Sequence, residues 1–423
     1  MTDSKYYYDI DDNQRRQFID SEQVRKSWLQ AEQRAINYRG SMYWQKSNGH
    51  DYLHREYSRG QRKYIGARSP EAENIFNEFK TGKKAAENRL KQLSAALVTQ
   101  ERLNSALRVG RTPNVVIGLL EEIRKAGLQD HLLVIGTNAL YAYETHAGVR
   151  FHGDVTATSD MDLLWDSRKR ITLLADAGND FNKAGLIGIL QKFDPTFELD
   201  EVKTRASNDQ GYMIDLIKRR PVSLFDDREK QQLLDNHPDD FWASKIRNMD
   251  WLLSAPKFKQ VIVGSSGKMA EMITVDPRAF ALYKVYLAQK EDRDPIKAPR
   301  DIAQAQSVYH LVQERMPLLS FDSIRYLPES LRNEKVFDIL DPNRAREPSI
   351  AEQFKAVPAF DEHSGVIKVV TQTEVIQYIG RGKHVVWDRS VLRGAPLDAG
   401  ADVTISKDGV VRSTQQKALG RDQ

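Results

Sequence analysis

LLVIGT at residues 132–137, DMDLLW at 160–165 and YMIDLI at 212–217 are three apolar segments, each with polar residues at fixed places. Successive side chains of a strand point to opposite faces, so Asp160 and Asp162 share one face. Asp215 stands among apolar residues, where an unpaired carboxylate is costly. We therefore predict neighbouring strands whose three carboxylates are compensated by a divalent cation.

The end of the first segment predicts a turn that binds phosphate. Gly136 lets the backbone approach a triphosphate, and a helix that begins just after it presents amide donors and its positive end. Thr137 and Asn138 can donate further hydrogen bonds to a phosphate oxygen. A glycine turn is also common between an ordinary strand and helix, so it indicates nucleotide binding only together with the aspartates.

The three aspartates fit the transfer of a nucleoside monophosphate from an NTP to a hydroxyl. Mg²⁺ and Mn²⁺ prefer oxygen ligands, and two such ions can stabilise both the attacking and the leaving oxygen. We predict that Asp160 and Asp162 bind the metal ions, and that Asp215 completes the metal site and draws the proton from the attacking hydroxyl. An Asp-x-Asp pair alone is more often a turn or a helix cap, so the prediction depends on the whole combination.

The order of these elements resembles the nucleotidyltransferase superfamily that includes DNA polymerase β, the CCA-adding enzymes and the antibiotic nucleotidyltransferases. Its pattern is an apolar residue and Gly-Ser, then Asp-apolar-Asp, then a further Asp. Thr137 stands here in place of the serine and keeps the hydroxyl. The gap between the glycine and the aspartate pair is longer than is common, which implies an insertion near residues 148–158.

A wider resemblance, over residues 20–315, is to a bacterial nucleotidyltransferase-like family related to the abortive-infection type IV toxins. It implies that Lys284 contacts the triphosphate, and that Asp301 acts near the metal site or orients a basic residue. Arg293 and Lys297 stand where this family has further basic residues. It also implies a toxin or antiphage role, with an antitoxin or another regulatory partner. From the residues alone, Lys284 is equally well a surface lysine, and Asp301 an acid that favours a helix N-terminus.

The composition restricts the classes of function. Of the 423 residues, 40% are hydrophobic and 29% are charged, which is typical of a folded globular protein. The absence of cysteine excludes disulfides, zinc–thiolate sites, iron–sulfur clusters and cysteine nucleophiles. The N-terminus lacks the apolar segment of a secretory signal, and no apolar run approaches the roughly 20 residues of a membrane helix. We predict a cytoplasmic protein without membrane contact.

Basic residues are unevenly placed, although the net charge is only +4. Basic clusters within residues 55–108 are interleaved with aromatic residues: Arg59, Arg62, Lys63 and Arg68, then Lys83, Lys84, Arg89 and Lys91, with Tyr52, Tyr57, Tyr64, Phe76 and Phe79 among them. Such a mixture can bind a nucleic-acid strand. On helices it is more often a solvated face with core contacts, and we favour this second interpretation.

The residue patterns predict an α+β or α/β protein. Its predicted parts are a helical N-terminal region (1–112), a nucleotidyltransferase core with a mixed sheet (113–220), a helical extension (221–340), a linker (341–359) and a small β-barrel-like domain with a tail (360–423). Within the first part, Ser69 and Pro70 predict the cap and the first residue of a long helix.

The last part of the chain resembles the KfrB-like domain of plasmid and mobile-element proteins. Five short β patterns separated by Gly, Asp and Pro predict a small barrel. Gln377, Gly380 and the pair Trp387-Asp388 match the pattern of that domain, with Trp387 standing where a histidine is usual. The resemblance implies a mobile element or a defence locus and identifies no ligand.

Two functions of different classes follow. The first is a Mg²⁺- or Mn²⁺-dependent nucleotidyltransferase that uses an NTP and modifies a hydroxyl of RNA, such as a tRNA 3′ end, or of a protein side chain. The second is a non-catalytic protein of a plasmid or mobile element that binds nucleic acid or a partner. A transferase that modifies small antibiotics is a third option, but it gives the basic helical region no use.

Overall fold

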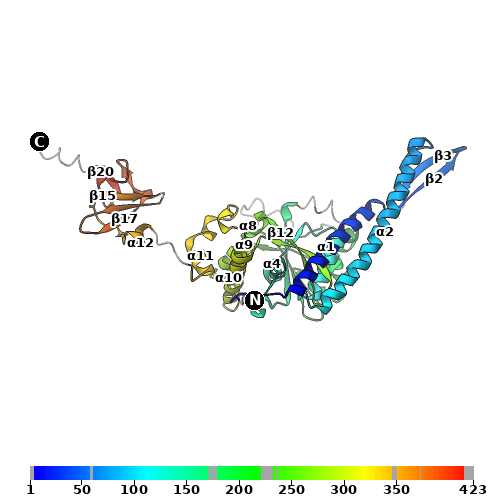
Figure 1. Cartoon of the computed structure of the whole chain (residues 1–423), viewed down its shortest axis with the longest axis horizontal. Coiled ribbons are helices and arrows are strands. Elements are labelled where there is room, and N and C mark those ends of the chain that lie inside the picture. The colour runs from blue at the N-terminus through cyan, green and yellow to red at the C-terminus, as the bar shows by residue number, and fades with distance from the viewer. Residues whose placement is uncertain are drawn as a thin grey trace. The chain divides into compact units, whose positions relative to one another are not determined.

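The computed structural model contains two compact units, Met1–Pro342 and Asn343–Gln423. Both units mix helices and strands (Figure 1), which confirms the predicted α+β class. The structure describes residues 4–57, 61–169, 173, 179–220, 232–234, 237–344, 350–371 and 373–413. Within these ranges, every helix is too short or too polar to cross a membrane.

The first unit is built around a mixed sheet that has eight strands in the described residues. Seven of the strands are, in pairing order, β12 (Lys257–Val263), β13 (Met269–Val275), β5 (Leu132–Ile135), β7 (Asp160–Trp165), β10 (Met213–Arg219), β9 (Arg205–Ser207) and β8 (Glu198–Leu199). The eighth, β11 (Ser244–Ile246), also pairs with β10. β7 runs parallel to β10 and antiparallel to β5, and β5 lies between β7 and β13. The sheet therefore extends into the predicted helical extension.

Helices cover both faces of this sheet. α3 (Asn114–Lys125) and α7 (Asn179–Phe193) pack on one face, and α4 (Leu140–Ala147), α8 (Met249–Ser254), α9 (Pro277–Ala288) and α10 (Lys297–Arg315) pack mainly on the other, where α11 (Glu334–Leu340) joins α9 and α10. The sheet is thus the middle layer between two hydrophobic cores.

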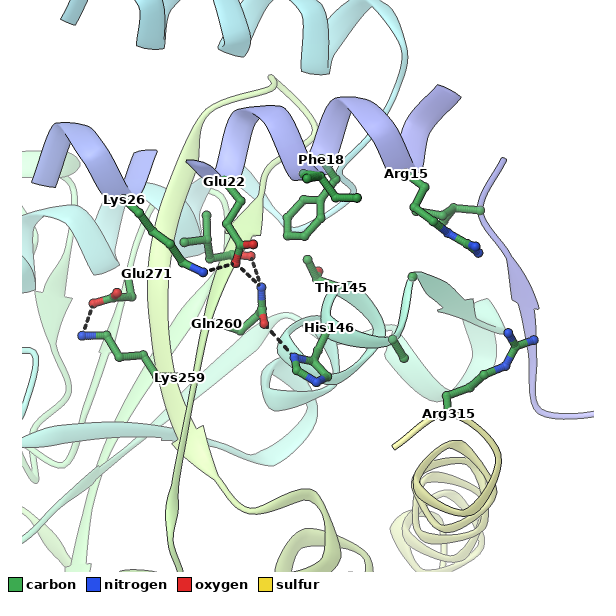
Figure 2. A pocket seen from close by; sticks show the side chains of 15 residues that line it. Arg15, Phe18, Glu22, Lys26, Thr145, His146, Lys259, Gln260, Glu271 and Arg315 are labelled. Carbon is green, nitrogen blue, oxygen red and sulfur yellow. Dashed lines mark hydrogen bonds and ion pairs between the residues drawn. The ribbon is translucent and has the colours of Figure 1, made fainter. Parts of the chain in front are cut away.

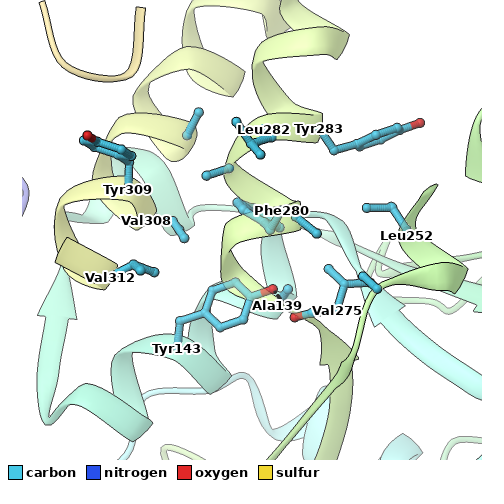
Figure 3. Close-up of a cluster of buried hydrophobic side chains, with 14 of the residues drawn as sticks. Ala139, Tyr143, Leu252, Val275, Phe280, Leu282, Tyr283, Val308, Tyr309 and Val312 are labelled. Atoms are coloured by element: carbon cyan, nitrogen blue, oxygen red, sulfur yellow. Dashed lines mark hydrogen bonds between the residues drawn. The ribbon is translucent and has the colours of Figure 1, made fainter. Parts of the chain in front are cut away.

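The core on the α9 face holds the helices that surround the candidate site. The hydroxyl of the fully buried Tyr143 donates to the main-chain carbonyl of Val275 at 2.8 Å (Figure 3). Phe280 of α9 packs edge-on against the Tyr143 ring, with ring centroids 5.5 Å apart. These contacts fix α4, which follows Gly136, and α9, which carries Lys284, on the same face of the sheet.

Alternation along β7 decides which face carries the acidic pair. Met161 and Leu163 are buried in the core of α3 and α7, whereas Leu164 is buried in the core of α9. Side chains two residues apart share a face, so Asp160 and Asp162 lie on the Leu164 face. The prediction that Asp160 and Asp162 share one face of the sheet is confirmed.

The N-terminal region contains a sheet that the sequence analysis did not predict. Its elements are β1 (Tyr7–Asp9), α1 (Asp12–Asn37), β2 (Ser41–Ser47), β3 (His50–Glu56), β4 (Arg62–Ala67) and α2 (Pro70–Ala106). Ser69 caps α2 as predicted. A helical region is wrong for residues 41–56, because Asn48 and Gly49, with φ angles of +47° and +80°, close a hairpin between β2 and β3. It is also wrong for residues 62–67, because β4 pairs with β3.

The predicted insertion near residues 148–158 forms two short elements, β6 (Val149–Phe151) and α5 (Gly153–Thr156). β6 pairs antiparallel with β1. The segment therefore anchors residues 7–9 to the first unit.

The second unit contains a β-sheet. Its pairing order is β14 (Val357–Pro358), β17 (His384–Asp388), β16 (Glu374–Tyr378), β15 (His363–Val370), β19 (Asp402–Ile405), β20 (Val410–Ser413) and β18 (Arg393–Gly394), and α12 (Ile350–Gln353) precedes it. In the described residues the sheet is open, because its two-residue edge strands pair only inward, so the predicted barrel is wrong. Gln377 lies in the core: its Nε2 donates to the carbonyl of Val403 and its Oε1 accepts from Nε1 of Trp387, both at 2.9 Å.

Candidate active site

The glycine turn lies directly against the acidic pair, because Gly136 is in contact with Asp162. Gly136 directly follows β5 and is the first residue of a 3₁₀ turn, η1 (Gly136–Ala139), that leads into α4. Its φ of +67° lies in the left-handed region that favours glycine. A β-carbon at this position would lie 2.3 Å from Oδ2 of Asp162. The turn and the carboxylate are therefore in contact, with no space for a side chain between them.

Gly136→Ala is expected to lower the free energy of unfolding by roughly 2–4 kcal/mol, because it combines a left-handed backbone with overpacking. Gly211→Ala is the matched control: Gly211 has a φ of +76°, but nothing lies within 4 Å of its β-carbon position. The control is expected to lose only about 1–2 kcal/mol. Denaturant unfolding measures both values, and equal losses would contradict the close contact with Asp162.

The three predicted aspartates meet on one face of the sheet. β7 and β10 run parallel with Asp162 beside Asp215, and Asp160 shares the face of Asp162. Burial and the negative charges of Asp160 and Asp215 raise the pKa of Asp162 to about 7, against the positive charges of Lys284 and Lys297. A divalent cation at this face would relieve the repulsion.

Asp215 already has a cationic partner. Arg205 stands opposite it on β9 and donates from Nε to Oδ1 at 2.6 Å and from Nη2 to Oδ2 at 2.7 Å. Asp160 accepts a hydrogen bond from the hydroxyl of Thr158. In the part of the chain that the structure describes, no three acidic or histidine side chains are arranged to hold a metal ion together. The carboxylates fit a divalent cation at Asp160 and Asp162, and Asp215 can join them only when Arg205 releases it.

Thr137 and Asn138 make contacts within the protein. Asn138 is buried, and its Nδ2 donates to the main-chain carbonyl of Asp160 at 2.5 Å. The hydroxyl of Thr137 accepts from Nε2 of Gln304 at 3.1 Å and from Nη2 of Arg300 at 3.4 Å. Asn138 thus ties the glycine turn to β7, and Thr137 ties it to α10. A role of either side chain toward phosphate stays a prediction.

Lys284, Asp301 and Arg293 form one charge cluster. Nζ of Lys284 donates to Oδ1 of Asp301, and Nε of Arg293 donates to Oδ2, both at 2.7 Å. Lys284 is buried, which lowers its pKa, and the negative charge of Asp301 opposes that effect. Lys284 is therefore no surface lysine, and Asp301 holds two basic side chains in place.

A cavity of about 190 Å³ brings part of this cluster to the aspartates. Gly136, Asp162, Lys284 and Arg293 line it together with apolar side chains of β10, β13, α8 and α9. Lys297 is exposed and outside this lining, although its charge acts on Asp162. Two of the predicted nucleotide-binding cations therefore share a cavity with one of the predicted catalytic aspartates.

Sequence reasoning missed Arg205 and Arg300. Arg205 lies on β9, a strand of three residues, and only the antiparallel register of this strand with β10 places Arg205 opposite Asp215. Arg300 donates to the main-chain carbonyl of Ala157, beside the acidic pair. The sequence contains a signal for Arg300, because a spacing of three and four residues puts Lys297, Arg300 and Gln304 on one face of α10.

A larger cavity, of about 660 Å³, has none of the predicted site residues in its lining (Figure 2). In it, Nε2 of Gln260 donates to Glu22 at 2.9 Å, and Oε1 of Gln260 lies 3.0 Å from Nδ1 of His146. Lys26 pairs with Glu22 at 3.0 Å. These contacts connect α1 with β12 and α4, so we assign them a structural role.

Comparisons with known proteins identify the family. No curated protein and no solved structure matches the chain. A family model described as nucleotidyltransferase matches residues 114–326, which include the glycine turn, the three aspartates and the Lys284 cluster. The match ends before the C-terminal unit, so the KfrB-like resemblance and the finer placement within the superfamily stay predictions. The match covers half of the 423 residues, and the chain therefore belongs to the nucleotidyltransferase family.

Proposed function

We propose that this protein is a Mg²⁺- or Mn²⁺-dependent enzyme that transfers a nucleoside monophosphate from an NTP to a hydroxyl of RNA or protein. Family membership supports nucleotidyl transfer and a nucleotide substrate. The observation that carries the metal-dependent mechanism is the position of Asp162, which touches the turn at Gly136 and faces the charges of Asp160 and Asp215. Asp160 and Asp162, joined by Asp215 once Arg205 releases it, favour the binding of a hard divalent cation.

Asp160 and Asp162 would hold the metal, which supplies charge neutralisation at the phosphate and stabilises the attacking and leaving oxygens. Asp215 would accept the proton of the attacking hydroxyl after Arg205 releases it. The contact between Gly136 and Asp162 keeps the main chain of the turn beside these carboxylates, where its N–H groups can meet phosphate oxygens.

Lys284 and Arg293 would balance the negative charge of the nucleotide. Both line the cavity that contains Asp162, and both are oriented by Asp301. Because their side chains are held by a buried carboxylate, they lose little rotamer entropy when a phosphate binds. This arrangement supports the nucleotide-binding roles that the family resemblance implies for them.

Arg205→Gln is expected to increase Mg²⁺ affinity roughly two- to fivefold, because it removes a half-exposed cation that competes for Asp215. Arg62→Gln, which removes a cation from β4, is the control and is expected to leave the affinity unchanged. Calorimetric titration with the metal alone measures the effect. An unchanged Mg²⁺ affinity of Arg205→Gln would show that the guanidinium does not compete with the metal.

The transfer reaction is tested with purified protein, Mg²⁺ or Mn²⁺, and each α-labelled NTP in the presence of total RNA and total protein. Label in RNA identifies an RNA-modifying enzyme, and label in protein identifies a protein-modifying one. The double variant Asp160→Asn/Asp162→Asn is expected to transfer nothing. If the intact protein binds metal but labels neither pool, the enzyme proposal fails and the non-catalytic alternative stands.

A further inference from the structure

The sheet of β2, β3 and β4 has two chemically different faces. On one face Leu53 is fully buried, and the guanidinium of Arg55 lies 3.9 Å from the ring centroid of Phe79 on α2. Trp44 on the same face packs against Phe76, with centroids 5.8 Å apart. Because strand side chains alternate, the residues between these point away from α2.

The face that points away carries a row of aromatic rings. The register of the strands places Tyr43 beside His54, and His54 beside Tyr64. The ring centroids are 6.1 Å apart for Tyr43 and His54, 5.8 Å for His54 and Tyr64, and 6.1 Å for Tyr52 and Tyr64. Tyr64 is 56% exposed, and the other three rings are partly exposed. We call this surface the aromatic face and define it by Tyr43, Tyr52, His54, Arg62 and Tyr64.

Positive charge accompanies these rings. The guanidinium of Arg62 lies 5.5 Å from the ring centroid of Tyr43, and its Nη1 donates to Oε1 of Gln45 at 3.1 Å on the same face. Counted over both faces of the sheet, residues 39–68 contain seven lysines and arginines but only two acidic residues, Asp51 and Glu56. Arg62 lies among the rings, with Glu56 as its neighbour across the strands, whereas Arg55 lies on the opposite face. The net positive charge of this segment favours a polyanion over a basic partner.

We propose that the aromatic face binds single-stranded nucleic acid by stacking bases on its rings. Bases stack on aromatic side chains of open sheets, while neighbouring arginines and lysines contact the phosphates. The bases of a duplex are already stacked on one another, so a single strand is the occupant that these rings select. This binding requires neither NTP nor metal, so it stands or falls independently of the proposed transfer reaction.

Fluorescence anisotropy with the full chain tests the proposal in the absence of NTP and metal. The probes are labelled single strands of roughly 20 nucleotides, oligouridylate and oligodeoxythymidylate, and a duplex of the same length. Both single strands are expected to bind more tightly than the duplex, and less tightly as salt rises. A preference for the RNA strand would add recognition of the 2′-hydroxyl to stacking.

A pair of double variants separates stacking from hydroxyl chemistry. Tyr52→Leu/Tyr64→Leu keeps apolar side chains on the strands and is expected to raise the dissociation constant at least about fivefold for each lost ring. Tyr52→Phe/Tyr64→Phe keeps the rings and is expected to bind as the parent does. If the leucine variant binds as tightly as the phenylalanine variant, the rings do not stack on bases and the proposal is overturned.

Photochemical crosslinking of the unmodified protein to a 4-thiouridine strand avoids any effect of substitutions on folding. Crosslinks are expected at Tyr43, Tyr52, His54 or Tyr64. Crosslinks confined to other parts of the chain would overturn the proposal, as would equal affinity for single strands and duplex. Self-association through this face without strand binding would also overturn it and assign the surface to a second copy of the chain.

Discussion

Asp162→Asn is expected to lower the rate of nucleotidyl transfer by roughly three orders of magnitude. A bound metal contributes several kcal/mol of charge stabilisation in the transition state, and each 1.36 kcal/mol corresponds to a factor of ten. The asparagine amide has the shape of the carboxylate and fits against Gly136, but it lacks the negative charge that holds a cation. Single-turnover transfer of an α-labelled NTP measures the rate.

Asp209→Asn is the matched control for this loss. It also neutralises an aspartate, but Asp209 is exposed in the loop before β10. It is expected to keep the parent rate within a factor of two or so, as surface substitutions usually do. A rate for Asp162→Asn within tenfold of the parent would contradict the assignment of Asp162 as a metal ligand.

Asp162→Asn is also expected to stabilise the metal-free fold at pH 8, by up to roughly 4 kcal/mol. The pKa of Asp162 is raised to about 7 in the folded protein, whereas an unfolded aspartate titrates near its ordinary value of 3.8. The folded state therefore prefers the protonated carboxyl. Its stabilising effect is complete below the unfolded pKa and is lost as the pH rises through the folded pKa. An amide is neutral throughout and escapes this loss.

Urea unfolding of both proteins in EDTA, at several pH values, measures the difference. The gain, which is the free energy of unfolding of the variant minus that of the parent, is expected to be near zero at pH 4 and to grow between pH 4 and 7. Mg²⁺ is expected to shrink the gain at pH 8, because a cation bound only by the folded parent stabilises it. A gain that stays constant across this pH range would contradict the raised pKa.

The central strands were predictable because their signals are local. Apolar segments with aspartates at alternating positions define both the strand and the face, and this placed Asp160 and Asp162 correctly. Arg205 was not predictable in the same way, since its contact with Asp215 depends on which strand pairs with β10 and in which register. The Lys284 cluster likewise depends on α9 and α10 packing together, a contact that joins residues 17 positions apart.

The N-terminal sheet was missed although a signal was present. Asn48-Gly49 between alternating segments is a strong hairpin pattern. The charged, helix-favouring sequences on both sides of it led to the prediction of a helical region instead. In the C-terminal unit the strands were recognisable, whereas closure into a barrel depends on the edges. Strand patterns alone do not determine whether β14 and β18 meet.

The position of β5 between β7 and β13 has a consequence for how the enzyme is made. The hydroxyl of Thr274 in β13 donates to the carbonyl of Val134 at 2.6 Å, which joins residues 140 positions apart in the chain. Strands paired over such separations form only after a large loop has closed. A chain still on the ribosome that ends before α9 carries all three aspartates but lacks Lys284, Arg293 and Asp301. Catalytic competence is therefore expected to arise late in synthesis. Lys284 and Arg293 can pack beside the sheet only after the strands with the three aspartates have been made.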